Sequence, residues 1–354
     1  MNNRLNNLRK ALRENGLDSL LVTQPENRRY LSGFHGSAGY LLITEKKALL
    51  ATDFRYTEQA SRQAPDFEVV RIKGKLSEWF PALVAGASVK KLGFEAEDVS
   101  YDAYKQFSGI LAEVEMVPVK GMAEKLRTVK EPEEIEYIEK AVAIADAAYD
   151  KVSSEIEAGM TEKQVAWEME KSLRENGSEA IPFEIIVASG PNAALPHARP
   201  TDRVINEGEP VVIDMGAKYR GYASDMTRTI CVGKPVDKFI TIYNIVLDAQ
   251  EAAESIIKRG MTGQQADSAA RDIIEKAGYG EFFGHSLGHG VGLAEHELPH
   301  LSPNAEEILG DGMVYTVEPG IYLTGWGGVR IEDTAVMENG RTRVITRARK
   351  VRYD

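Results

Sequence analysis

The chain has almost no cysteine: Cys231 is the only one among 354 residues. An intramolecular disulfide is therefore excluded, and such cysteine usage is typical of proteins in the reducing cytoplasm. The opening residues MNNRLNNLRK also lack the apolar stretch of a secretory signal, so we expect a cytoplasmic protein. Cys231 lies in the strand-like run TRTICVG, and we interpret it as a buried, unreactive thiol rather than a nucleophile.

Long apolar runs and basic segments are missing as well. The longest apolar runs, such as SLLVT and YLLIT, have the length of strands and fall far short of the roughly 20 residues that span a bilayer. The 43 basic residues are outnumbered by 54 acidic ones, the formal net charge is −11, and no segment is rich in Lys or Arg. Because this disfavours a nucleic-acid groove and an anionic membrane surface, we expect neither partner.

The chain is long enough for two domains, because one hydrophobic core rarely grows beyond about 250 to 300 residues. Residues 3–120 alternate between helix-like and strand-like stretches, which predicts a small α/β domain. A charged segment, GMAEKLRTVKEPEE, follows, and its Pro132 suits the first turn of a long helix that we expect to reach about Glu157. We place the boundary near Ala123, with domains at 1–123 and 124–354.

The second domain contains a faint internal repeat. AGMTEKQ at 158–164 returns as RGMTGQQ at 259–265, an offset of 101 residues. Each copy holds a Thr-x-x-Gln capping box, on Thr161 or Thr262, which predicts the start of a helix. Because a helix precedes and strands follow each copy, we predict a duplicated α+β unit of two helices and a sheet. The alternative is two independent capping boxes of similar sequence.

Two aspartates, Asp214 and Asp225, lie eleven residues apart in VVIDMGAKYRGYASDMTRTI. The residues on both sides of KYRGY alternate like strands and KYRGY itself carries turn residues, so the two carboxylates could meet across a hairpin. Divalent cations such as Mg²⁺ and Ca²⁺ need oxygen ligands, and a pair of ions needs carboxylates that can bridge them. Taken alone, either aspartate would more often be a solvated or capping residue.

Three further residues strengthen the metal interpretation: His289 in GHSLGHGVG, Glu318 in TVEPG and Glu332 in RIED. Glu318 and Glu332 interrupt strands that otherwise bury apolar residues, where an unpaired carboxylate would be costly to desolvate. Four carboxylates supply about −4 and two divalent ions about +4, while the imidazole adds a neutral ligand. Together the residues predict a site for two metal ions.

This ordered set, in the settings DMGAKYRGYASD, GHGVG, TVEPG and RIED, resembles the pita-bread metallopeptidases, which include methionine aminopeptidase, aminopeptidase P and prolidase. The resemblance covers essentially the whole chain. NRRYLSGFHGSAG and ATDFRYTEQA are similar to the N-terminal domain of the creatinase, prolidase and aminopeptidase P branch, and KLRTVKEPEEIEYI is similar to its interdomain segment. The resemblance implies a creatinase-type α/β domain followed by an α+β pita-bread catalytic domain with an internal pseudo-twofold duplication.

The same resemblance implies a role for each metal ligand. Asp214 would chelate one ion, and His289 and Glu318 would hold the other. Asp225 and Glu332 would bridge the two ions. A water between the ions would be the nucleophile, since coordination brings its pKa towards 7. Four carboxylates and one histidine suit Mn²⁺ or Co²⁺ without excluding Zn²⁺.

Further residues would contact the substrate. By the resemblance, His197 and His296 would bind it and stabilise the tetrahedral intermediate, and His285 would line the pocket. Each of these histidines, taken alone, would more often be structural. Glu318 could also carry a proton from the nucleophilic water to the leaving amine.

Arg330 lies two residues before Glu332, on what we expect to be the same face of a strand. There it could pair with a carboxylate of the site or of the substrate. The alternative is an ordinary structural ion pair.

The preference for proline comes from the resemblance alone. The N-terminal domain favours prolidase and aminopeptidase P over methionine aminopeptidase, and the full ligand set disfavours the creatinase-type enzymes that use the fold without metal. Prolidases recognise the free carboxylate of a dipeptide, and many carry an Arg four residues after the His of their HExP segment. Because this chain has His300 there, it offers one donor in place of a charged, bidentate fork.

We therefore predict an Xaa-Pro dipeptidase (prolidase), favoured by the 354-residue layout and by the 14-residue step from Glu318 to Glu332. The alternative is an Xaa-Pro aminopeptidase that acts on longer proline-containing peptides. A non-catalytic pita-bread binding module is a remote alternative, since no ligand is lost and no basic insertion is present. The resemblance also implies a homodimer.

Overall fold

The computed structural model describes residues 3–353, which form two compact units that separate after Arg127. The expected boundary between residues 123 and 124 falls inside helix α6 (Met122–Arg127). Ala123 and Arg127 are buried on this helix, and the Arg127 guanidinium donates to Asn27 Oδ1 at 2.7 Å. Because these contacts tie α6 to the first unit, the division comes at the end of the helix.

The first unit alternates helices and strands, as the sequence predicts. Its other elements are α1 (Asn3–Glu14), β1 (Ser19–Val22), α2 (Pro25–Ser32), β2 (Tyr40–Thr44), β3 (Ala48–Thr52), α3 (Thr57–Gln63), β4 (Glu68–Arg71), α4 (Leu76–Gly86), β5 (Lys91–Glu95), α5 (Tyr101–Ile110) and β6 (Glu115–Val119). The six strands form one mixed sheet in the order β4-β3-β2-β1-β5-β6, in which β1 pairs antiparallel with β2 and parallel with β5. This sheet is the core of an α/β domain.

The helices of the first unit show where periodicity predicts structure and where it does not. Leu5, Leu8 and Leu12 form the buried face of α1, at the spacing that predicts a helix. The sequence does not predict α2, because its buried residues include the polar Asn27 and Arg28, which interrupt the apolar pattern. Tertiary contacts rather than local periodicity therefore stabilise α2.

The second unit consists of two similar halves. The first half contains α7 (Pro132–Ser153), α8 (Glu162–Glu175), β7 (Ile186–Ser189), η1 (Gly190–Ala194), β8 (Pro210–Met215), β9 (Lys218–Tyr219), β10 (Tyr222–Ala223) and β11 (Met226–Cys231). The second half contains α9 (Asp237–Ile256), α10 (Gly263–Lys276), η2 (Gly280–Phe282), β12 (Gly288–Gly290), β13 (Glu297–Leu301), β14 (Val314–Val317), β15 (Gly320–Leu323), β16 (Gly327–Arg330), β17 (Asp333–Glu338) and β18 (Arg341–Val344). The long helix α7 begins at Pro132, as predicted, but ends at Ser153 rather than near Glu157.

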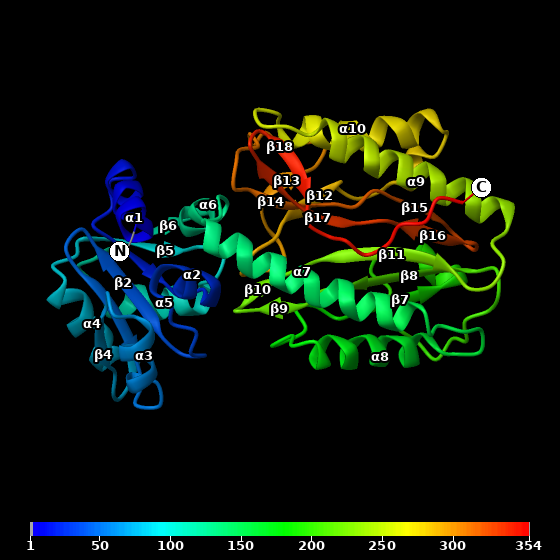
Figure 1. Cartoon of the computed structure of the whole chain (residues 1–354). Coiled ribbons are helices and arrows are strands. Elements are labelled where there is room, and N and C mark those ends of the chain that lie inside the picture. The colour runs from blue at the N-terminus through cyan, green and yellow to red at the C-terminus, as the bar shows by residue number, and fades with distance from the viewer. Residues whose placement is uncertain (1–2, 354) are drawn as a thin grey trace. The chain divides into compact units, whose positions relative to one another are not determined.

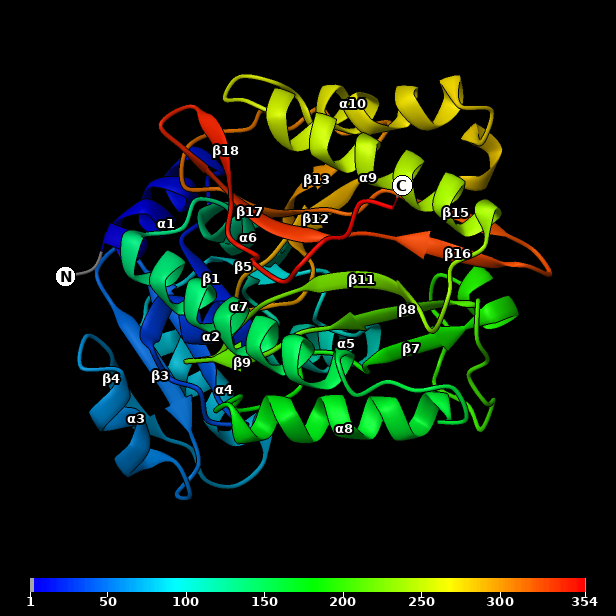
Figure 2. The same cartoon turned by 45° about the vertical axis from the view of Figure 1, so that its right-hand side comes forward.

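The strands of the second unit lie between helices. The main sheets have the strand orders β11-β8-β7 and β13-β12-β14-β17-β18. In Figure 1, α9 and α10 lie along one outer side of these strands and α8 along the opposite side. Figure 2 shows α7 running in front of β7, β8 and β11. Each half has its own apolar core, one including Met169 and Ile213 and the other including Phe239 and Tyr315.

Equivalent backbone contacts support the internal duplication. Thr161 forms an isolated β-bridge with Val204, and Thr262 forms one with Ile308. Both threonines are the N-cap of a helix with a complete capping box, as predicted. The neighbouring backbone bonds are also equivalent, from Ile205 N to Met160 O and from Leu309 N to Met261 O. This shared pattern favours duplication over two independent capping boxes.

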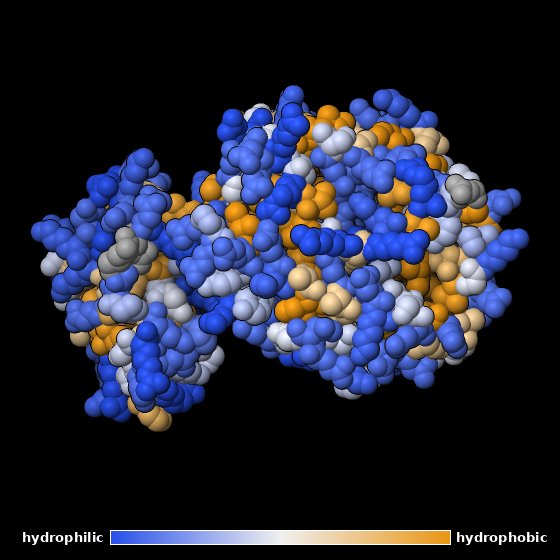
Figure 3. Space-filling model, viewed as in Figure 1, coloured by the Kyte–Doolittle hydropathy of each residue, from blue (hydrophilic) through white to orange (hydrophobic). Residues whose placement is uncertain are grey.

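Among the described residues, no helix is both long and apolar enough to cross a membrane. The face shown in Figure 3 is mostly hydrophilic, with apolar residues in separate patches on the second unit. Large exposed apolar side chains occur on both units, among them Phe54, Trp167 and Ile308. Apolar side chains exposed singly in this way are common on folded proteins.

Cys231 ends strand β11 and is half-buried. Burial raises the pKa of its thiol to about 11, so at pH 7.5 fewer than about one thiol in a thousand is ionised.

We expect iodoacetamide to alkylate the native protein slowly at pH 7.5, at a rate that rises about tenfold per pH unit towards pH 11. Mass spectrometry of timed samples measures this rate, with unfolded protein as the control. Rapid alkylation of the native protein at pH 7.5 would contradict the interpretation of an unreactive thiol.

Candidate metal centre

A strand-turn-strand segment positions the two aspartates. Strands β8 and β11 pair antiparallel, with Asp214 opposite Thr227. Asp225 directly precedes the first residue of β11, and it lines the same cavity as Asp214. The connecting turn contains Arg220 and Gly221, whose φ angles of +49° and +76° are those of a tight hairpin turn. The predicted hairpin is present, and the two aspartates are diagonal neighbours across it rather than directly opposite.

His289 is the middle residue of β12, which pairs with both β13 and β14. A Cβ atom on Gly288 would lie 2.0 Å from Thr316 O, and one on Gly290 would lie 2.1 Å from Leu298 O, so only glycine fits on either side of the histidine. His289 Nδ1 is 3.1 Å from Gly290 O and donates to it. The lone pair is therefore on Nε2, which is the tautomer that a metal ligand needs.

Glu318 and Glu332 lie just beyond the ends of strands. Glu318 follows β14, and Glu332 lies between β16 and β17. Thr316 Oγ1 donates to Glu318 Oε1 at 3.0 Å, and Thr227 Oγ1 donates to Glu332 Oε2 at 2.6 Å. Arg330 and Glu332 do not share a strand as expected, because β16 ends at Arg330, but both side chains line the same cavity.

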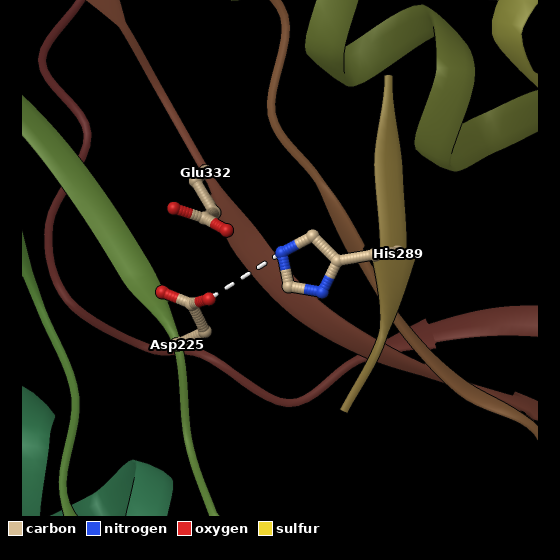
Figure 4. Close-up of side chains that lie close together, drawn as sticks. All are labelled: Asp225, His289 and Glu332. Carbon is tan, nitrogen blue, oxygen red and sulfur yellow. Dashed lines mark ion pairs between the residues drawn. The ribbon is translucent and has the colours of Figure 1, made fainter. Parts of the chain in front are cut away.

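The side chains converge on one buried cluster. Figure 4 shows Asp225, His289 and Glu332, whose ligand atoms lie within 4.8 Å of one another. His289 Nε2 is 3.6 Å from Asp225 Oδ2 and 3.3 Å from Glu318 Oε1. Burial raises the pKa of Asp225 and of Glu332 well above their usual values, and repulsion from neighbouring carboxylates adds to the shift. Burial also raises the pKa of Glu318 to about 7. Carboxylates so close together need cations in order to be ionised together.

The cluster fits divalent cations. Among the described residues, Asp214 Oδ1 and Glu332 Oε1 are buried atoms without a hydrogen-bond partner. Unpartnered, buried carboxylate oxygens are costly unless a cation meets them. Four carboxylates and one imidazole nitrogen form a donor set that Mn²⁺, Co²⁺ or Zn²⁺ accepts. All five residues predicted as ligands line one cavity, while the assignment of each residue to an ion stays a prediction.

Arg330 is buried and pairs with a carboxylate of the cluster, because its Nη2 lies 2.6 Å from Asp214 Oδ2. Its Nε donates to Thr227 Oγ1 at 3.0 Å, and its Nη1 donates to the hydroxyl of Tyr322 at 3.0 Å. We expected Arg330 to pair with a carboxylate of the site or of the substrate, and the structure shows a carboxylate of the site. Tyr322, which the sequence did not single out, links Arg330 to His285 through a contact of 2.8 Å.

A cavity of about 490 Å³ opens onto the cluster. The four histidines predicted to contact substrate all line it: His197, His285, His296 and His300. His300 lies opposite His289 in the pairing of β12 with β13, so both side chains are on the same face. The ring of His296 packs against that of His289, with 4.1 Å between their centroids.

His285 is held more tightly than the other cavity histidines. Its Nδ1 donates to Ser286 O and its Nε2 accepts from the Tyr322 hydroxyl, each at 2.8 Å. Burial lowers the pKa of His285 to about 4, and the field of Arg330 adds to the shift. His285 is therefore a neutral part of the cavity wall with both ring nitrogens engaged.

Glu162 anchors the segment that carries His197, a role that could not be predicted from the sequence. Its carboxylate is fully buried and accepts from Ser189 N at 2.7 Å and from Thr201 N at 3.0 Å. The Asn192 amide donates to both oxygens of the same carboxylate at 3.1 Å. Both ends of the segment between Ser189 and Thr201 are therefore fixed by one side chain.

Two family models match the chain over most of its length. Residues 136–339 match metallopeptidase family M24, and residues 4–129 match the creatinase/prolidase N-terminal domain. The chain belongs to metallopeptidase family M24. This result confirms the resemblance on which the pita-bread fold and the prolidase and aminopeptidase P branch were predicted.

Relatives of this M24 peptidase match both of its units. It is 41% identical to an Xaa-Pro dipeptidase from Pyrococcus furiosus over 353 residues, which are 99% of this chain and 100% of that protein. The solved structure of an Xaa-Pro dipeptidase from Bacillus anthracis is 44% identical, with a TM-score of 0.96 over 99% of this chain and 98% of that chain. An X-Pro aminopeptidase from Thermotoga maritima is 39% identical, with a TM-score of 0.89 over 97% of each chain.

Proposed function

We propose that this M24 peptidase is an Xaa-Pro dipeptidase, which hydrolyses the bond between an N-terminal residue and proline. The observation that carries the proposal is the buried cluster of Asp225, His289 and Glu332 on the cavity, in a chain similar to Xaa-Pro dipeptidases over its whole length. An Xaa-Pro bond has no N–H group and its ring is rigid, so it needs a dedicated pocket.

The proposed cofactor is a pair of divalent ions, Mn²⁺ or Co²⁺ in the first place. Asp214 would hold one ion, and His289 and Glu318 the other, while Asp225 and Glu332 would be shared. When bound, the ions would activate a water and polarise the scissile carbonyl. The hydrogen bonds from Thr227 and Thr316 support this arrangement, because they orient two of the carboxylates towards the cluster.

Protein side chains on the cavity would do the remaining work. His197 and His296 would donate to the carbonyl oxygen as negative charge develops on it, which is the step that preorganised donors accelerate most. Glu318 lies beside His289 at the cavity and would carry a proton to the leaving amine. His285, His300 and Arg330 would shape the substrate pocket.

Removal of the metal ions tests the cofactor directly. We expect dialysis against a chelator to abolish hydrolysis of Xaa-Pro dipeptides, and Mn²⁺ or Co²⁺ to restore it. Elemental analysis of the active protein should find about two transition-metal ions per chain. Full activity in chelator, with no bound transition metal, would show that the cluster is not a metal centre.

An Xaa-Pro aminopeptidase acting on longer peptides is the second candidate. His300 favours it, because a neutral imidazole offers the carboxylate of a dipeptide one donor, whereas arginine offers a permanently charged fork. The similarity to the X-Pro aminopeptidase from Thermotoga maritima also supports it.

His300→Arg separates the two candidates. We expect the variant to gain preference for Xaa-Pro over Xaa-Pro-Xaa by about 1 to 3 kcal/mol, because the new charge would pair with the dipeptide carboxylate. The measurement is kcat/KM for both peptide lengths in both proteins, and their ratio removes any general damage to the metal centre. If the ratio stays unchanged, His300 does not face the substrate carboxylate.

We also propose that the peptidase is a cytoplasmic homodimer. The single cysteine supports a reducing compartment, and the resemblance to the prolidase branch supports the dimer. Light scattering of the purified protein tests the assembly, and a molar mass of one chain at micromolar concentration would contradict it.

A further inference from the structure

Glu295 is a carboxylate of the cavity that forms no ion pair with a Lys or Arg of the described residues. It lies in the turn between β12 and β13 and lines the cavity. Among residues 3–353, its ionic partner is His296, whose Nδ1 is 3.3 Å from Glu295 Oε1. An imidazole carries no permanent charge, so this contact does not balance the carboxylate as a Lys or Arg would.

The other carboxylates of the cavity already have counterparts. Asp214 pairs with Arg330 at 2.6 Å, and Glu184 pairs with Arg199 at 3.0 Å. The remaining three belong to the proposed metal centre: Asp225, Glu318 and Glu332. With these assigned, Glu295 is the one cavity carboxylate of the described chain that neither a metal ion nor an ion pair with arginine would neutralise. The field of Lys218 reaches Glu295, but the two side chains form no ion pair.

The turn that carries Glu295 is held in place. Glu297 Oε1 accepts from Ala294 N at 2.8 Å, and Glu297 Oε2 lies 3.2 Å from Lys130 Nζ in an almost fully buried ion pair. On the other side of the turn, Gly292 O accepts from Ala223 N at 2.7 Å. Glu295 is therefore a fixed part of the cavity wall rather than a side chain on a free loop.

Glu295 lies one imidazole ring away from the metal centre, because it contacts His296, which packs against His289. The α-amino group of a substrate is close to the scissile carbonyl and hence to the ions. A cationic group that reaches Glu295 must extend further, as the side chain of the residue before proline does. Burial raises the pKa of Glu295 to about 7; the field of Asp214 adds to the shift and the field of Lys218 opposes it. A cation beside Glu295 would favour the ionised form.

We propose that Glu295 gives this peptidase a preference for Lys or Arg before proline, by binding the cationic end of that side chain. The inference rests on the proposed Xaa-Pro hydrolysis and adds its substrate class. The contact would be a charge-assisted hydrogen bond at a half-buried carboxylate, where water and salt screen it less than on an open surface.

Lysyl-proline and norleucyl-proline test the proposal, since their side chains have similar length and differ in charge. We expect kcat/KM of the metal-loaded enzyme to be about tenfold higher for lysyl-proline, and the ratio to fall towards one in Glu295→Gln. Glu306→Gln, which removes an exposed carboxylate outside the cavity, should keep the ratio. The ratio of the unmodified enzyme should also shrink as ionic strength rises, which a merely structural role would not produce.

Each other outcome has a definite meaning. Equal kcat/KM for the two dipeptides in the unmodified enzyme would overturn the inference but leave Xaa-Pro hydrolysis in place. A uniform loss for both dipeptides in Glu295→Gln would overturn it as well, because it would assign Glu295 to the α-amino group or to the integrity of the turn. Hydrolysis of neither dipeptide by metal-loaded enzyme would overturn the proposed function and the inference together.

Discussion

Asp225→Asn should lower kcat for Xaa-Pro hydrolysis by more than about 100-fold even with metal in excess, since loss of a mere partner of a ligand already costs 10- to 100-fold. The Asp225 carboxylate lies within reach of both His289 and Glu332 in the buried cluster. An amide keeps the shape of the side chain but removes the negative charge that two cations would share. Metal titration of the variant should show weaker binding at both positions.

The matched control is His285→Ala, which alters the same cavity without touching the carboxylate cluster. We expect a smaller loss of kcat, because His285 contacts Tyr322 and Ser286 rather than the carboxylates. If both variants keep near-normal turnover with metal in excess, Asp225 is not a metal ligand.

Stability of the metal-free protein distinguishes a chemical effect of Asp225→Asn from misfolding. The pKa of Asp225 is raised well above its usual value by burial and by repulsion from Glu332. A raised pKa in the folded state means that stability is lost as the pH rises from the ordinary aspartate range through the folded pKa. Asparagine has no such charge, so at pH 8 and in chelator the variant should unfold at the same or a higher temperature than the unmodified protein. A lower unfolding temperature would point to misfolding.

The residues of the proposed metal centre could be singled out from the sequence because each stands out locally. Asp214 and Asp225 flank a turn between two apolar strands, and His289 lies between glycines whose Cβ positions the backbone of neighbouring strands occupies. Glu318 and Glu332 interrupt apolar runs. In each case a polar residue appears where local periodicity would bury an apolar one, and that conflict is visible in one sequence.

The partners of these residues could not be found in the same way, because their contacts join distant segments. Thr227 donates to Glu332 across 105 positions, and Glu162 accepts from Thr201 across 39. A threonine in a strand or a glutamate in the first turn of a helix is ordinary by local rules. Such residues support the site only in the folded chain, where β8 pairs with β11 and both strands lie beside the segment after β16.

Arg228 is another residue that supports the site through contacts with distant segments. Its side chain is fully buried in β11 and pairs with Asp333 at 2.6 Å. It also donates to three backbone carbonyls, those of Thr227, Glu332 and Ala348. The field of Asp333 raises the pKa of Arg228 despite the opposing effect of burial, so the group stays charged. Removal of this one guanidinium therefore takes a hydrogen-bond donor away from a buried carboxylate and from three backbone carbonyls.

We expect Arg228→Met to lower the free energy of unfolding by about 3 to 5 kcal/mol, the cost of removing one partner from a buried ion pair. Lys350 still contacts Asp333 at 2.7 Å, which keeps the loss within that range rather than above it. The control is Arg352→Met, because Arg352 pairs with Asp248 and Glu251 on the surface, where such pairs contribute at most about 1 kcal/mol. Denaturation of both variants in chelator excludes stabilisation by bound metal from the comparison.

If Arg228→Met unfolds at the same denaturant concentration as Arg352→Met, the buried pair does not hold β11 to β17. If it unfolds earlier, as we expect, the metal-loaded variant should also bind metal more weakly, because the backbone of Glu332 has lost the donor that fixes it.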